Sequence, residues 1–158
     1  MTPSTADEKR AFKIAIKNQC AFILQQRINA LGAAMQSAQE SANNDDKSSA
    51  GDKYEVGRAM GHLQQEMLAK QLDDATGELA LVNSLNPEVF CTTVSKGAAV
   101  ICNGLFFFVA IGLGNVVVNN QKVIVLSPIA PLAALMLDKR AGDSFSFNKN
   151  EVKILDVF

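Results

Sequence analysis

The chain has 158 residues, a formal net charge of −1 and 20% charged residues. This near balance argues against a general nucleic-acid coat, which needs a basic excess. The length suits one ordinary domain or two small ones. Its 3 cysteines are widely spaced without a CxxC pair, and there is 1 histidine. That set predicts neither a disulfide framework nor a zinc site, and it suits a reducing cytoplasm.

The N-terminal segment and the apolar stretch near the middle of the chain predict neither a signal peptide nor a membrane span. The opening MTPSTADEKR lacks the apolar core and cleavage site of a signal peptide. The stretch 97–121 is uncharged, but Asn and Gly residues divide it into pieces of strand length. A span needs about 20 continuous apolar residues. We therefore expect a cytoplasmic protein with no membrane partner.

Residues 6–42 predict a long helix. Thr5 or Asp7 is suited to cap its start. Apolar residues recur with an a/d heptad spacing, in which only Lys17 is out of place. The basic residues of this helix are then best interpreted as solvated coiled-coil surface: Lys9, Arg10, Lys13, Lys17 and Arg27. The predicted seam consists of Ile14, Ala21, Leu24, Ile28, Leu31, Met35, Ala38 and Ala42.

Residues 52–82 predict a second helix, with Asp52 as its N-cap. Two apolar stripes follow each other along it, and the second is displaced by one position. Two such helices with a short polar connection predict an antiparallel coiled-coil hairpin over residues 1–84, with arms about 45–55 Å long. The first stripe is Val56, Met60, Leu63 and Met67, and the second is Leu68, Leu72, Ala75, Leu79 and Val82.

Residues 85–158 predict a separate small domain, because Pro87 ends the helical pattern. Strand-like runs alternate with turn signals such as Asn103-Gly104. A short helix fits 128–139. The fold class is therefore α+β: the helical hairpin is followed by an antiparallel sheet with one helix on one face. The predicted strands are 97–102, 105–111, 115–118, 121–126, 144–147 and 151–157.

The connection between the helices, NNDDKSSAGDKYE at 43–55, is rich in acid. Asn, Asp, Ser and Gly are ordinary turn residues, so a solvated loop is one interpretation. The other is a set of carboxylates held at the end of a rod. Mg²⁺ commonly takes one or two protein carboxylates and completes its shell with water or phosphate. Such a connection is suited to complete a metal site inside a partner.

Two stretches resemble the Gre-type transcript cleavage factors of bacterial RNA polymerase. One is SPIAPLAALMLDKRAGDSFSF at 127–147, with EVKILDV at 151–157 in the place of the last strand. The other is DDKSSAGDKYEVGRAM at 45–60. The resemblance implies an N-terminal coiled coil with acids at its tip and an FKBP-like C-terminal domain. It also implies that the tip enters the polymerase's secondary channel.

The resemblance further implies a role for particular residues. The family's tip Asp falls on Asp46, but Ser49 stands where the family has Glu three residues later. Asp52 and Glu55 have the same spacing and are the next candidates, followed by Asp45. These acids would act on Mg²⁺ shared with the polymerase, reach the RNA 3′ end indirectly, and form no active site in this chain. The loop at Ser127, Pro128 and Ile129 is the candidate polymerase contact.

The sequence leaves several alternatives open. Because of Ser49, the protein could bind the channel and inhibit or modulate the polymerase without stimulating cleavage. It could be a coiled-coil adaptor without metal chemistry. The basic residues of the first helix could instead lie near extruded RNA. A prolyl isomerase is disfavoured, because Phe106, Phe107 and Phe108 alternate in facing rather than converge.

Overall fold

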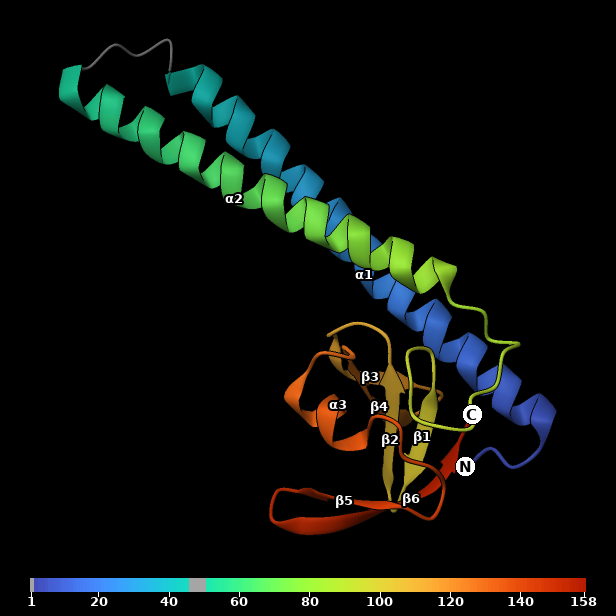
Figure 1. Cartoon of the computed structure of the whole chain (residues 1–158). Coiled ribbons are helices and arrows are strands. Elements are labelled where there is room, and N and C mark those ends of the chain that lie inside the picture. Colours follow the sequence, from blue (N-terminus) through green and yellow to red (C-terminus); the bar gives the residue numbers. More distant parts are fainter. Residues whose placement is uncertain (1, 46–50) are drawn as a thin grey trace. The chain divides into compact units, whose positions relative to one another are not determined.

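A computed structural model describes residues 2–45 and 51–158, and side chains at 2–44 and 56–158. The fold is α+β, as predicted, with two long helices followed by a sheet and a short helix (Figure 1). The elements are α1 (Ala6–Asp45), α2 (Gly51–Ser84), β1 (Ala99–Cys102), β2 (Leu105–Val109), β3 (Gly114–Val118), β4 (Gln121–Leu126), α3 (Pro131–Met136), β5 (Ser144–Phe147) and β6 (Asn150–Val157).

The chain forms two compact units. The sheet unit combines Met1–Phe22 with Ala80–Phe158, and the hairpin unit is Ile23–Leu79. The N-terminal turns of α1 and the last turn of α2 therefore belong to the same unit as the sheet. None of the helices that the structure describes is long and apolar enough to cross a membrane.

The sheet has six strands in the order β3-β4-β2-β1-β6-β5. The pairs are antiparallel except that β2 and β4 run parallel, a detail that the sequence did not predict. Tight turns connect the two strands of the β3–β4 hairpin and those of the β5–β6 hairpin. Asn119 and Asn120 have φ of 50° and 64°, and Asn148 and Lys149 have φ of 51° and 64°. Two consecutive positive φ values match the right-handed twist of the flanking strands.

The two faces of the sheet are both covered. Phe107 lies in the hydrophobic core together with Met136 of α3. Its ring packs edge-on against that of Phe145, with 6.2 Å between the two ring centroids. Phe106 faces the other side, where its ring centroid lies 5.8 Å from that of Phe12 in α1. The prediction of one helix on one face was therefore incomplete, because the first turns of α1 cover the second face. The alternation of the phenylalanines is as predicted.

The start of α1 is capped within the sheet unit. The Thr5 hydroxyl accepts a hydrogen bond from the Glu8 amide at 3.1 Å. Glu8 Oε2 in turn accepts from the Ser4 and Thr5 amides at 2.8 and 3.2 Å. This reciprocal capping box satisfies amides that the helix itself leaves without partners. The Ser4 amide is the main reason that the pKa of Glu8 lies below its usual value.

Lys13 departs most sharply from the predicted pattern. It is only 2% exposed, whereas Ile14, placed in the predicted seam, is 37% exposed. The Lys13 ammonium donates to the Val89 carbonyl at 2.8 Å and lies 5.7 Å from the Phe90 ring centroid. Burial lowers the pKa of Lys13. The prediction that Lys13 lies on solvated surface was wrong, because its ammonium satisfies a carbonyl inside the sheet unit.

Lys17, the residue that did not fit the predicted seam, binds carbonyl groups at the C-terminal end of α2. Its ammonium donates to the Leu85 carbonyl at 2.8 Å and to the Asn83 carbonyl at 3.3 Å. The last carbonyls of a helix have no partners within it and carry partial negative charge, so a cation there is stabilising. Neighbouring basic residues are also paired: Lys9 with Asp156, and Arg10 with Asp7 and Glu88. These pairings leave little support for RNA contact by this part of α1.

The hairpin unit uses a different face of α2 from the one predicted near its start. Ala75 is buried and Leu68, Leu72 and Leu79 are half-buried, as expected for a seam. Toward the connection the same face continues through Gln65 and Gly61, which are also half-buried. The predicted first stripe is exposed instead. Because successive residues lie 100° apart around a helix, a stripe displaced by one position leaves the seam when α2 stays straight.

Candidate functional site

The acids of the connection lie where the two helices end. Asp45 is the last residue of α1, and Asp52 follows Gly51, the first residue of α2. Asp52 is therefore inside the helix and not its N-cap, a correction that leaves it in the first turn. Glu55 lies one turn further along α2. Asp46 and Ser49, on which the family resemblance turns, lie outside the described residues.

The helical backbone sets which acids share a face. Asp52 and Glu55 are three positions apart in the helical backbone of α2, the spacing of neighbouring positions on a helix. A carboxylate in the first turn also suits the positive end of the helix dipole. Among the described side chains, no three His, Cys, Asp or Glu residues come together to hold a metal ion. The metal role of Asp46, Asp52 and Glu55 stays a prediction.

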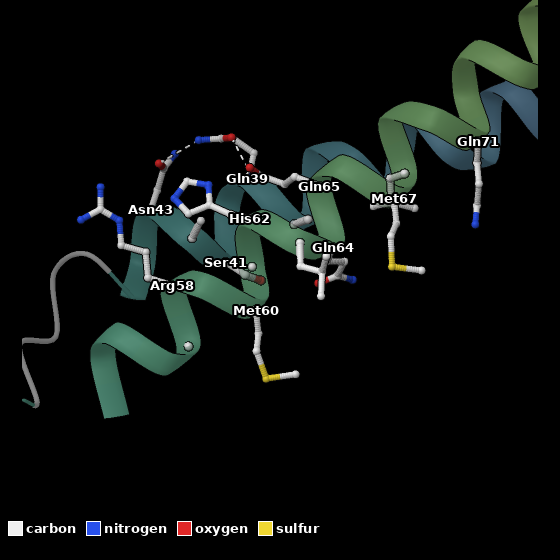
Figure 2. Close-up of a pocket in the computed structure, with 16 residues that line it drawn as sticks. Gln39, Ser41, Asn43, Arg58, Met60, His62, Gln64, Gln65, Met67 and Gln71 are labelled. Atoms are coloured by element: carbon white, nitrogen blue, oxygen red, sulfur yellow. Dashed lines mark hydrogen bonds between the residues drawn. The ribbon is translucent and has the colours of Figure 1, made fainter. Parts of the chain in front are cut away.

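Next to the connection, the hairpin unit has an exposed apolar surface on α2. We call Val56, Met60, Leu63 and Met67 the outer stripe. Their exposed fractions are 61%, 65%, 56% and 56%. Figure 2 shows Met60 and Met67 projecting from the same side of α2. Scattered apolar residues are common on protein surfaces, but four in regular helical spacing form a patch of the kind that marks an interaction site.

Three residues of the outer stripe, Met60, Leu63 and Met67, also line a groove of about 580 Å³ that runs along α1 and α2. Ala38 and Ala42 line it from α1, and Leu68 extends it along α2. Around these lie amides, and the Gln65 amide donates to Gln39 across the hairpin at 3.0 Å (Figure 2). The bond is exposed: Gln65 is half-buried, and Gln39 lies on the exposed side of α1 next to the half-buried Ala38. Arg58 and His62 also line the groove.

The loop at Ser127, Pro128 and Ile129 follows β4 in the sheet unit. The Ala130 amide donates to the Ser127 carbonyl at 3.0 Å, which closes a turn. The Ile129 amide lies 3.4 Å from the Ser127 hydroxyl oxygen, to which it donates. Ile129 is 92% exposed, the highest value among the large apolar side chains that the structure describes as exposed. Ser127 and Pro128 are half-buried, so Ile129 projects into solvent from a turn whose first residues are partly packed against the sheet unit.

Sequence reasoning assigned the outer stripe to the hairpin seam and so missed it as a surface. The signal was present, since the two stripes of α2 are displaced by one position and cannot both face α1 in a straight helix. Sequence reasoning also missed Lys13, because an isolated lysine in a helical pattern carries no sign of a buried carbonyl partner.

No family model and no curated protein matches this chain. Among solved structures, the chain resembles that of the transcription factor Gfh1, with 18% sequence identity and a TM-score of 0.35. The alignment covers 88% of this chain and 93% of that one. This likeness is too distant to assign a family.

Proposed function

We propose that this protein is a cytoplasmic factor that binds bacterial RNA polymerase and places the connection of its helical hairpin in the secondary channel. The observation that carries the proposal is the presence of four acids between positions 45 and 55 of the sequence, the segment that joins the end of α1 to the start of α2. The Gre-like stretch at 127–147, with the exposed Ile129 in its first turn, supports it.

In this role the chain supplies carboxylates and the polymerase performs the chemistry. Mg²⁺ accepts one or two carboxylates and keeps water or phosphate in its other positions. A second metal in a phosphodiester-cleaving site activates water and stabilises the leaving oxygen. Asp46 is the first candidate for this contact, and Asp52 with Glu55 is the second. The outcome would be hydrolysis of backtracked RNA by the polymerase itself.

A second function is favoured by one specific residue. Ser49 stands where the Gre-type pattern has Glu, so the pair of carboxylates that holds the metal is incomplete at that spacing. A factor that enters the channel without completing the metal site would occlude it. The protein would then inhibit or modulate the polymerase and leave RNA cleavage unchanged. Both functions need the same docking, which is therefore the first thing to test.

Ile129→Asp is expected to weaken binding to the cognate core polymerase at least about tenfold, because it puts a charge at the centre of an apolar contact. Fluorescence anisotropy of the labelled full chain would measure the affinity. Val117→Asp is the matched control, since Val117 is 61% exposed on the edge strand β3. Equal affinity of the wild type and Ile129→Asp would remove this loop from the docking surface. Absence of wild-type binding would reject the proposed function.

A further inference from the structure

The outer stripe has a spacing that is symmetric along the helix. Val56, Met60, Leu63 and Met67 are separated by four, three and four positions. All four are more than half exposed. Within the hairpin unit, α1 packs on a different face of α2, as the hydrogen bond between Gln65 and Gln39 marks. The described part of the chain therefore leaves this apolar stripe open to a partner.

A four-three-four spacing reads the same in both directions. A second copy of α2 lying antiparallel on the first would place Met60 against Leu63 and Val56 against Met67, twice each, around a two-fold axis. That is the a/d layering of an antiparallel coiled coil, and the contact is isologous. Methionine is unbranched and adapts its shape to irregular apolar neighbours. Its two copies in the stripe suit a contact between identical surfaces.

The residues that flank the stripe also suit this pairing. On one edge Gly57 would face Gln64 of the other copy, and on the other edge Ala59 would face Glu66. Each pair sets a small residue against a long one, and no like charges meet at these edge positions. The next positions of the same spacing are Lys53 and Lys70, which this register would set in one layer, Lys53 of one copy with Lys70 of the other. Their like charges oppose pairing there, and they limit the apolar contact to four layers.

We propose that the protein self-associates as an antiparallel dimer through the outer stripe of α2. Four half-exposed side chains from each copy, with the groove walls beside them, remove on the order of 1,000 Å² from water. That area is typical of weak, reversible association. The dimer would cover the turns of α2 next to the acidic connection. The proposal does not rest on polymerase binding, since it concerns this chain alone.

Sedimentation velocity of the full chain, from about 1 μM to about 500 μM, tests association over the range that fits such an area. The sedimentation coefficient is expected to rise with concentration. Leu63→Gln is expected to weaken the dimer at least about tenfold, and the exposed-strand control Val117→Gln should leave it unchanged. A wild type that stays monomeric throughout, or a dimer that Leu63→Gln does not weaken, would overturn the proposal.

Cysteine pairing tests the register separately. In a Cys91→Ser background, Val56→Cys mixed with Met67→Cys is expected to form a disulfide between copies. Each variant alone should not, because its two cysteines would lie about 16 Å apart along the dimer, beyond the reach of a disulfide. Cys20 and Cys102 are buried and should stay silent. Equal cross-linking by either variant alone would mean a parallel pairing and would contradict the register.

Discussion

Lys13→Glu is expected to lower the free energy of unfolding by about 4 kcal/mol, because it leaves a buried charge without a partner. The glutamate would replace an ammonium that donates to the Val89 carbonyl at 2.8 Å. It would set a carboxylate against that carbonyl oxygen and against the negative face of the Phe90 ring. Typical domains are stable by only about 5–15 kcal/mol. The variant would therefore lose a large part of the stability of the sheet unit.

Urea unfolding of the full chain, followed by far-ultraviolet circular dichroism, measures this effect. Lys122→Glu is the matched control, since Lys122 is exposed on β4, and it should change stability by no more than about 0.5 kcal/mol. Lys13→Met keeps the apolar stem and removes only the donor, so it should cost about 1–3 kcal/mol. If Lys13→Glu were as stable as Lys122→Glu, the buried contact of Lys13 would be wrong.

Asp46→Asn is expected to reduce factor-stimulated RNA cleavage in backtracked polymerase complexes by on the order of 100-fold. A carboxylate that holds a catalytic metal contributes a few kcal/mol to the barrier, and each 1.4 kcal/mol is about tenfold in rate. Asparagine keeps the size and removes the charge. Affinity for the polymerase should change little, because the proposed docking surface is the loop at 127–129.

The double variant Asp52→Asn/Glu55→Gln is the matched comparison, because these acids have the i, i+3 spacing of the family motif on α2. A smaller loss than for Asp46→Asn is expected. Full activity of Asp46→Asn with loss in the double variant would move the metal contact onto α2. No loss in either variant, with wild-type cleavage intact, would contradict a catalytic role for these acids. Competition for the channel without any cleavage would identify the modulator that Ser49 suggests.

Much of the fold followed from local signals in the sequence. The Asn103-Gly104 turn joins β1 and β2 as predicted, and Thr5 caps α1 with Glu8. These features depend on neighbours along the chain, so a single sequence carries them. The two long helices extend beyond the predicted bounds, to Asp45 and from Gly51. Asp and Gly residues are tolerated at helix ends. Because the residues around the connection are also typical of turns, their composition did not indicate that the helices continue there.

What the sequence did not provide depends on partners distant along the chain. Lys13 lies 76 positions from Val89, the residue whose carbonyl it contacts. Nothing in the sequence around Phe12 indicates a contact with the sheet, yet its ring packs on Phe106. The sequence of α2 contains two apolar stripes, and only packing against α1 determines which of them lies in the hairpin seam. A pattern of apolar residues shows that a face is present but not what covers it.

The proposed entry of the protein into the secondary channel is tested most directly by locating the hairpin connection inside the polymerase. Ser49→Cys in a Cys91→Ser background would carry an iron chelate that cuts nearby nucleic acid. Burial raises the pKa of the Cys20 and Cys102 thiols to about 11, so these should not be labelled. If the connection lies in the secondary channel, the chelate should cut the nascent RNA close to its 3′ end in a stalled elongation complex. A chelate that binds with the protein yet cuts only elsewhere, or not at all, would contradict it.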